Sequence, residues 1–489
     1  MAGTGAATKI SVTESARNYT VPMVVLTSLF FMWGVIACMN DILIPFLKKI
    51  FELSRAESML VQMAFFTAYF SGSLIYFLIS SRKGDPIEKI GYKNGILIGL
   101  TIAAVGCALF YPAAQLKIYW FFLAALFILA FGLAMLQIAS NPYVAILGPP
   151  ETASSRLNLS QGFNSLGTTL APIVGGYFVF HFFANWGQPL LNKLGEPITT
   201  DTGLTMSALG VQLPYLIFAL IFILLAVLVY FTDLPVFKSE EKIEKGAGAL
   251  RYRHLTLGMV AIFLYVGGEV AIGSLLINYI YELIGLPEIE AKSFLAFYWG
   301  GLMIGRFLGA ISLRHSANEF NRLLVMIAIA AGSYLVIYLA VYIESGFTFE
   351  FSRITPYFIF MVLNLIAFRI GRSNASKTLL IFSIIIIGLL AFTMMSGGTI
   401  AMWTVLSIGL FNSIMWSNIF TLAIRDLGKY TSQGSSLLIM SVLGGAVVPW
   451  LQAMLADHLG GYHYSFFIPM LCYVYLAWYG LKGYKVKIG

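Results

Sequence analysis

The sequence predicts an all-α polytopic membrane protein with two pseudo-symmetric six-helix bundles and an inserted helical pair. Hydrophobic residues make up 59% of the 489 residues and charged residues only 11%, whereas a soluble globular chain carries about 25% charged residues. Long apolar runs recur along the whole chain, and one stretch with polar residues between two such runs occurs twice. Together these observations predict about 14 transmembrane helices.

The repeated stretch is 137–172, which matches 415–449. The matched pairs are Ser140 with Ser417, Asn141 with Asn418, Gly167 with Gly444 and Pro172 with Pro449. All four pairs share one offset, since 417 − 140 and 449 − 172 both give 277. Many transporters are built from two repeats that meet around polar residues at membrane depth, so the repeat points to that architecture.

The first half of the chain is expected to hold a polar cytoplasmic tail, 1–20, and an N-terminal six-helix bundle, 21–232. The apolar run at about 21–47 is too long for a signal-peptide core, and no cleavage site follows it, so it is the first predicted span. The other five predicted spans lie near 57–80, 94–113, 118–147, 157–185 and 208–232.

A charged cytoplasmic linker, 233–254, precedes a C-terminal bundle at 255–489. The eight predicted spans of this half lie near 255–284, 290–312, 321–343, 356–371, 376–396, 400–424, 435–456 and 462–482. The span at 356–371 falls short of the roughly 20 residues that a crossing needs. If Gly267 matches Gly34, the second half carries two surplus helices before Asn418. We therefore expect 320–372 to be an inserted pair, which preserves the orientation of everything after it.

Lysine and arginine set the predicted orientation. With the N-terminus inside, 22 of the 30 Lys and Arg residues fall on the inner face, 7 fall in outer loops, and Arg306 lies within a helix. Cytoplasmic loops carry the excess of positive charge in membrane proteins. Both termini are therefore expected to be cytoplasmic, and the net charge of +8 indicates membrane orientation rather than nucleic-acid binding.

Two carboxylates fall inside predicted spans. Asp41 lies in WGVIACMNDILIPFL and Glu269 in FLYVGGEVAIGSLL. An ionised carboxylate in hydrocarbon is costly, so such acids normally face a cavity, a partner or an exchangeable proton. Asp41 has an alternative as an acid at the outer helix end, because Pro45 and Lys48 follow soon after. Glu269 has an alternative as a structural partner of Arg306. Both are candidate cation-coupling residues.

Uncharged amides form the candidate substrate site. They are Asn40, Gln137, Asn141, Gln161, Asn164, Asn278, Asn412 and Asn418. Amides both donate and accept hydrogen bonds, as sugar hydroxyls do, although each one alone serves as often to join helices. Aromatic rings could stack on a sugar ring, or simply pack. The candidates are Phe65, Phe66, Tyr69, Tyr298 and Trp299.

Other chemistry is missing from the sequence. The run GRFLGA at 305–310 follows no strand and so is no phosphate loop, and no G-x-x-x-x-G-K-[ST] motif occurs. The three cysteines and five histidines show no metal-ligand spacing. We therefore expect no cofactor, no metal and no enzyme activity, and transport driven by an ion gradient or by the solute gradient itself.

Several motifs are spread along the chain. They are MWGVIACMNDILIP, GYKNG, ASNPYVAILGPPETASSRLNLSQGFNSLGTTLAP, FLYVGGEVAIGS, FYWGGLMIGRFLGA, FNSIMWSNIFTLAIRDLGKYTSQGS and GGAVVP. Together they resemble the fucose permease family of the major facilitator superfamily, and within it the bacterial glucose/galactose permeases. The resemblance covers nearly the whole chain apart from the N-terminal tail and 320–372. It implies the major facilitator fold, alternating access and symport of a monosaccharide with a proton.

The resemblance also implies residue roles. Asp41 falls on the family's acid in N-D-I-L-I-P, which is tied to coupling. Gln161 and Asn164 fall on amides that line the sugar cavity of the fucose permease. Gln137 departs from the fucose permease, which has a glutamate there, and agrees with the glucose/galactose branch. This departure counts against fucose and removes one protonation site, which Glu269 could replace.

Three function classes compete. A hexose symporter, driven by protons or by sodium, fits the amides. An exporter of a drug or small metabolite would have a larger and more apolar cavity, and a membrane sugar sensor would carry a signalling domain that we do not expect here. We expect a monomer in the bacterial inner membrane, in contact with lipid. The sugar stays open among glucose, galactose, mannose and N-acetylated sugars.

Overall fold

The computed structural model describes residues 19–183, 186–192, 195–199, 203–237, 245–314 and 318–486. Among these residues, 13 helical segments are long and apolar enough to cross a membrane. One more helix, α7 (Ala153–Tyr177), has 25 residues but carries several Asn, Gln and Ser residues. With α7 included, six spans precede the linker and eight follow it, so the prediction of an all-α membrane protein is confirmed.

The first half folds into six spans, which are made of seven helical segments, and one further short helix, α3. They are α1 (Thr20–Phe51), α2 (Arg55–Lys83), α3 (Pro86–Ile90), α4 (Tyr92–Ala108), α5 (Phe110–Leu116), α6 (Tyr119–Ile146), α7 (Ala153–Tyr177) and α8 (Leu209–Phe231). The segments α4 and α5 form one span. Ser54 begins α2 with a capping box, in which its side chain accepts from the Glu57 backbone N–H.

The second half holds ten helices in eight spans. They are α9 (Arg253–Ile284), α10 (Glu288–Ser312), α11 (Glu319–Glu344), α12 (Tyr357–Gly371), α13 (Ala375–Met395), α14 (Gly398–Asn412), α15 (Met415–Ala423), α16 (Thr431–Met440), α17 (Gly444–Leu459) and α18 (Phe467–Trp478). The spans α14–α15 and α16–α17 are each interrupted near the middle. The span expected at 356–371 starts earlier, at Phe351, which gives it 21 residues and removes the shortfall.

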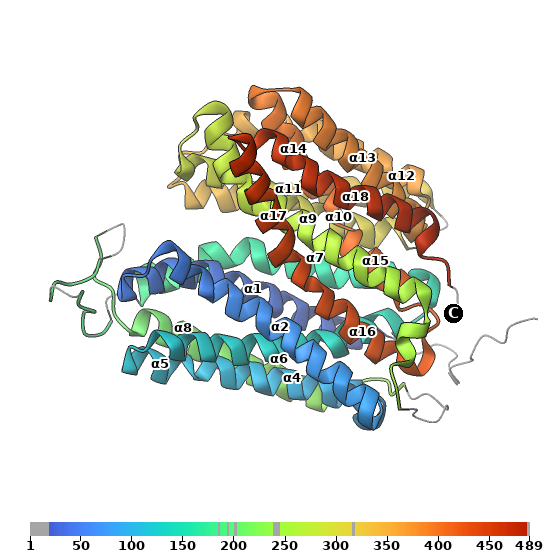
Figure 1. The fold of residues 1–489 in the computed structure, drawn as a ribbon, viewed down its shortest axis with the longest axis horizontal. Coiled ribbons are helices and arrows are strands. Elements are labelled where there is room, and N and C mark those ends of the chain that lie inside the picture. Colours follow the sequence, from blue (N-terminus) through green and yellow to red (C-terminus); the bar gives the residue numbers. More distant parts are fainter. Residues whose placement is uncertain are drawn as a thin grey trace, which may run out of the picture.

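The helices form two groups, α1–α8 and α9–α18, which lie against each other along a seam (Figure 1). The helices α7 and α10 pack together on one side of this seam, and α2 and α16 on the other. We call the end at which α1 begins, α8 ends and α9 begins the linker end. The other end carries the β-bridged loop between α7 and α8.

Side-chain hydrogen bonds join the two groups at the linker end. They are Ser154 Oγ with Thr421 Oγ1 (2.6 Å), Ser155 Oγ to Ala310 O (2.5 Å), Asn158 Nδ2 to Asn418 Oδ1 (3.3 Å), Ser432 Oγ to the Tyr92 hydroxyl (3.2 Å) and Gln433 Nε2 to Ser80 Oγ (3.1 Å). Gln433 also accepts from the Ala249 N–H of the linker at 2.9 Å. The linker end of the seam is therefore closed.

Asp85, which caps α3 next to this closure, is buried. It accepts from the Tyr76 hydroxyl at 2.5 Å and from the Ile87 backbone N–H at 2.9 Å. Burial raises the pKa of this carboxyl above its ordinary value, and these hydrogen bonds offset only part of the effect.

Glycines let the first helix of each half closely approach a later span of the same half, α7 in the first half and α17 in the second. A Cβ at Gly167 of α7 would lie 2.4 Å from the Phe31 carbonyl oxygen of α1. A Cβ at Gly444, its repeat partner, would lie 1.9 Å from the Phe263 carbonyl oxygen of α9. The two matched glycines therefore serve the same close helix crossing, as an internal repeat requires.

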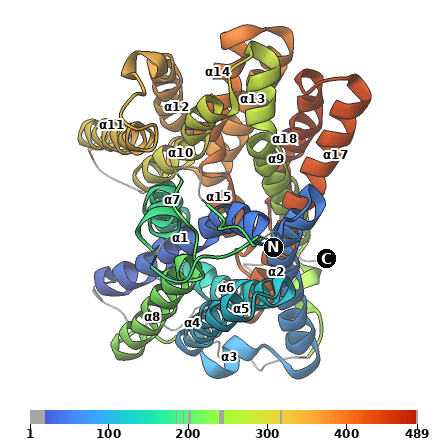
Figure 2. The ribbon, with the colours of Figure 1, turned by 90° about the vertical axis from the view of Figure 1, so that its left-hand side faces the viewer.

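The helices α11 and α12 lie at one edge of the second group (Figure 2). The Tyr357 hydroxyl donates to Phe297 O at 2.9 Å, and Asn364 Nδ2 donates to Leu410 O of α14 at 3.0 Å. Arg353 pairs with Glu290 at 2.9 Å. The pair is thus attached to the second group by two buried hydrogen bonds and one partly exposed ion pair, and the amide nitrogen of Asn364 binds α14. Its origin as an insertion stays a prediction.

The close crossing predicts that Gly444→Ala destabilises the protein by about 1–3 kcal/mol or more, because the added methyl must push α9 and α17 apart. Gly388→Ala is the matched control, since a Cβ at Gly388 of α13 meets nothing within 4 Å. Thermal unfolding of both purified variants checks this. Equal melting temperatures would contradict the close approach.

Candidate functional site

In the first group, one candidate amide is hydrogen-bonded to a tyrosine hydroxyl. Gln137 of α6 is 2% exposed, and its Nε2 donates to the hydroxyl of Tyr69 in α2 at 2.8 Å. The Trp33 side chain of α1 also interacts with that hydroxyl. Three helices of the first bundle are therefore tied together around the Tyr69 hydroxyl.

The second group repeats this arrangement with an extra member. Asn412 of α14 is fully buried, and its Nδ2 donates to the hydroxyl of Tyr298 in α10 at 3.0 Å. Its Oδ1 accepts from the Tyr473 hydroxyl of α18 at 2.8 Å. Tyr298 in turn donates to the backbone oxygen of Glu269 in α9 at 2.8 Å. Both polar ends of Asn412 are therefore occupied within its own bundle.

The two arrangements use equivalent helices. In each bundle a tyrosine of the second span meets an amide of the fourth span, if α11 and α12 are left out of the count, as Tyr69 with Gln137 and Tyr298 with Asn412. Hydroxyls and amides can exchange such bonds for bonds to another hydroxyl compound. Each bundle therefore offers a polar pair near mid-membrane that is satisfied in this conformation.

Arg306 lies at the seam, whereas Asn164 binds a neighbouring helix of its own bundle. Asn164 of α7 donates to the Phe30 carbonyl oxygen of α1 at 3.0 Å, which ties two helices of one bundle. Arg306 of α10 crosses the seam and donates to the Ser165 hydroxyl of α7 at 2.5 Å. The ion pair with Arg306 that was the alternative role for Glu269 is thus not formed: the guanidinium bonds to a hydroxyl and a carbonyl oxygen, and Glu269 interacts with it electrostatically.

Glu269 is half-buried in the middle of α9. The Tyr265 hydroxyl lies beside its carboxyl without the geometry of a full hydrogen bond in this conformation. Trp299 of α10 is 36% exposed, and Asn278 is exposed in the half of α9 away from the linker end. These two side chains are therefore accessible, whereas the paired amides are not.

Three candidate amides lie nearer the linker end than the tyrosine pairs. Asn141 is fully buried with neither amide atom hydrogen-bonded, and Gln161 is 2% exposed with its Nε2 unpaired. Asn418 donates to Ala375 O at 3.0 Å and accepts from Asn158 across the seam. The structure thus separates these amides from Gln137 and Asn412 rather than gathering all candidates in one cluster.

The side chains of Asn40 and Asp41 lie outside the described part of the structure, although the backbone of both belongs to α1. Their predicted roles therefore stay predictions.

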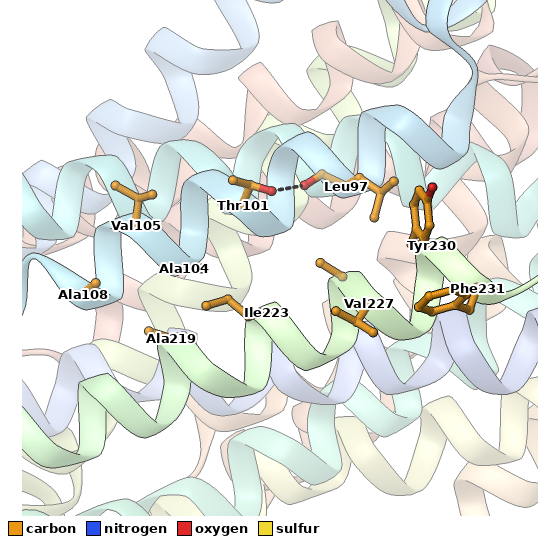
Figure 3. Close-up of a pocket in the computed structure, with 11 residues that line it drawn as sticks. Leu97, Thr101, Ala104, Val105, Ala108, Ala219, Ile223, Val227, Tyr230 and Phe231 are labelled. Carbon is orange, nitrogen blue, oxygen red and sulfur yellow. Dashed lines mark hydrogen bonds between the residues drawn. The ribbon is translucent and has the colours of Figure 1, made fainter.

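A cavity of about 500 Å³ opens between α4 and α8 (Figure 3). Its lining is apolar except for two hydroxyls, that of Thr101, which donates to Leu97 O of the same helix at 2.8 Å, and that of Tyr230 at one end of the cavity. Val105 and Ile223, on its two sides, are about half exposed. The few polar groups of this cavity could not satisfy the many hydroxyls of a sugar, so this groove does not suit a sugar site.

Sequence reasoning missed Asn158 and Ser165. Both belong to a polar stripe of α7 with helical spacing, formed by Asn158, Gln161, Ser165 and Thr168. This spacing could have predicted both residues, because it puts one polar face on an otherwise apolar span, and such a face has to pack against polar groups of the protein. The tyrosine partners Tyr69 and Tyr298 had been considered only as stacking rings.

A sequence profile of the Major Facilitator Superfamily matches residues 24–354. The chain belongs to this superfamily. It is 41% identical to a glucose/galactose transporter of Brucella abortus over 97% of this chain and 96% of that protein. It is 31% identical to the L-fucose-proton symporter of Escherichia coli, with 94% and 92% covered. These relatives are transporters, so the predicted family is confirmed, and with it the prediction that the chain is not an enzyme.

The solved structures of the Escherichia coli fucose:proton symporter show the same fold. One of them, described as an outward conformation, gives a TM-score of 0.71 at 28% identity, covering 96% of this chain and 99% of that one.

The double role of Asn412 predicts a structural cost. In Asn412→Ala the hydroxyls of Tyr298 and Tyr473 lose their partner, and an unsatisfied buried polar group costs about 1–3 kcal/mol. Asn278→Ala, which removes an exposed amide, should change stability by less than about 0.5 kcal/mol. Thermal unfolding in detergent compares them, and an unchanged Asn412→Ala would disprove the bridge.

Proposed function

We propose that this chain is a secondary active transporter that imports a glucose- or galactose-type hexose by proton symport through alternating access. The observation that carries this is the 41% identity to a glucose/galactose transporter across 97% of the chain. Gln137 supports the hexose branch, because its amide pairs with Tyr69 as a neutral group. The choice of the proton as the coupled cation is supported by the relatives that are named as proton symporters.

We propose that the hydroxyls of the hexose replace the tyrosine hydroxyls as hydrogen-bond partners of the amides in the two polar pairs. Gln137 would then leave Tyr69, and Asn412 would leave Tyr298, as sugar enters between the bundles. The proposed substrate residues are Asn40, Gln137, Asn141, Gln161, Asn164, Asn278, Trp299, Asn412 and Asn418. Asn278 and Trp299 would meet the sugar first, because they are accessible in this conformation.

Asp41 is proposed as the acid whose protonation is coupled to sugar movement, with Glu269 as the second acid. Each lies in the first helix of its repeat, α1 and α9, so the two acids belong to corresponding helices of the two halves. A sodium-coupled carrier is the alternative, because carboxylate oxygens also suit hard cations. An exporter of a small metabolite with the same fold is a weaker alternative, since the seam carries so many amides.

The proposed setting is the bacterial inner membrane, with both termini and the linker in the cytoplasm and the protein as a monomer among lipids. The linker end would then be the cytoplasmic end. Arg82, Lys83, Lys89, Lys93 and Arg156 all lie at that end, as the distribution of positive charge requires. The proposed domains are 21–232 and 255–489, with 320–372 as a peripheral inserted pair.

Counterflow into proteoliposomes tests the substrate. Vesicles preloaded with unlabelled glucose or galactose should take up the same labelled hexose transiently, and vesicles preloaded with fucose should do so less. Protein-free vesicles are the control. No counterflow with any hexose would reject the proposed function.

Uptake driven by an imposed gradient tests the coupling acid. Asp41→Asn mimics the protonated carboxyl permanently, so it should abolish accumulation driven by a proton gradient and retain counterflow, which needs no net proton transfer. Wild-type uptake under a sodium gradient at fixed pH separates the two cations. Full accumulation by Asp41→Asn would remove Asp41 from the mechanism.

A further inference from the structure

Arg306 is a cation inside the seam between the two bundles. Its side chain is 8% exposed, and its Nη1 donates to the Ser165 hydroxyl of the other bundle at 2.5 Å. Its Nε donates to the Ser413 carbonyl oxygen of its own bundle at 3.3 Å. One hydrogen bond of this guanidinium therefore crosses the seam, and the other stays within one bundle.

The crossing bond has to break when α7 and α10 move apart. The two helices are tightly packed at this level, since a Cβ at Gly162 would lie 2.8 Å from the Phe307 ring. After separation, Ser165 is out of reach and the guanidinium keeps only the Ser413 carbonyl oxygen. A buried charge that loses its partner is strongly destabilising. Opening of the seam therefore requires a replacement acceptor for Arg306.

Glu269 can provide that acceptor only while it is ionised. Its carboxyl interacts electrostatically with Arg306 from α9 and lies beside Tyr265 of the same helix. The other titratable groups that feel its charge are Tyr298 of α10 and Tyr473 of α18. Tyrosine hydroxyls are uncharged near neutral pH, so the charge balance of this cluster depends on Glu269 and Arg306.

Building on the proposed symport, we propose that Arg306 prevents the protonated carrier from crossing the membrane without sugar. In the empty carrier with ionised Glu269, the carboxylate replaces the Ser165 hydroxyl as the hydrogen-bond acceptor of the Arg306 guanidinium, and the seam opens. In the loaded carrier with protonated Glu269, a sugar hydroxyl accepts instead. In the protonated, empty carrier neither acceptor exists, so Arg306 stays on Ser165 and the linker end stays closed.

This assignment makes Arg306 a positioning residue that enforces coupling. The proton that reaches Glu269 from the end opposite the linker leaves at the linker end only together with sugar, because the leaking state lacks an acceptor for the guanidinium. Ser165 holds the closed position of this switch.

Proton flux into proteoliposomes without sugar is the test, read with a pH-sensitive dye inside the vesicles under an inward proton gradient. Wild type should be as tight as protein-free vesicles. Arg306→Gln needs no charged acceptor in any state, so its sugar-free proton flux should rise about tenfold or more, and its proton-to-sugar ratio under load should fall. Ser165→Ala, a small change at the seam, should leak as well because the closed state loses its hydrogen bond.

Arg156→Gln is the matched control. Arg156 donates to the carbonyl oxygens of Val144 (3.1 Å) and Pro149 (3.0 Å), both within the first bundle, so removing its charge should leave the vesicles proton-tight. Thermal unfolding in detergent shows that each variant is folded, because it does not depend on sugar binding or on proton movement.

The outcomes separate the two proposals. Absence of counterflow in wild type rejects the proposed function. Counterflow in wild type together with tight vesicles for both Arg306→Gln and Ser165→Ala overturns the role of Arg306. Leakage in Arg156→Gln equal to that in Arg306→Gln, or accumulation driven by sodium without proton movement, overturns it too.

Discussion

Every polar group within the spans has to find its partner inside the protein, because hydrocarbon offers none. This constraint explains why the amides of Gln137 and Asn412 sit on tyrosine hydroxyls, and why Asn364 of a peripheral helix reaches the Leu410 carbonyl oxygen. A polar residue can serve a moving pathway only if its partner can be exchanged. Contacts to tyrosine hydroxyls, to a sugar or to the opposite bundle are exchangeable, whereas contacts to the backbone of the same bundle persist.

The same constraint shapes the seam. The helix α7 is the least apolar of the spans, and it can be so because its polar face lies on α10 and α15 rather than on lipid. Asn141 and Gln161 keep unpaired amide atoms in this buried region. Such groups make the closed linker end less favourable than a fully paired interface would be. A carrier has to open this end, so an interface of marginal stability suits its function better than a tight one.

The two halves of the internal repeat agree more closely at positions that pack helices together than at positions that form polar contacts. Gly167 and Gly444 make the same crossing in the two halves, because any side chain there would separate helices that must touch. The polar positions have diverged: Tyr69 meets a glutamine in one half, whereas in the other Tyr298 meets an asparagine that also accepts from Tyr473. A sugar is not symmetric, so identical polar pairs in both halves would serve it poorly.

The sequence by itself determined the fold class, the spans and the repeat, because hydrophobic run length and glycine spacing are local properties of the chain. It also determined which residue types are polar at depth, and hence the list that contains Gln137, Asn412 and Glu269. Only the tertiary structure decided their partners: which amide meets a tyrosine, and that Arg306 reaches Ser165 in the other bundle. Those pairings join positions more than 60 residues apart, and their geometry follows from how whole helices cross, which no local pattern encodes.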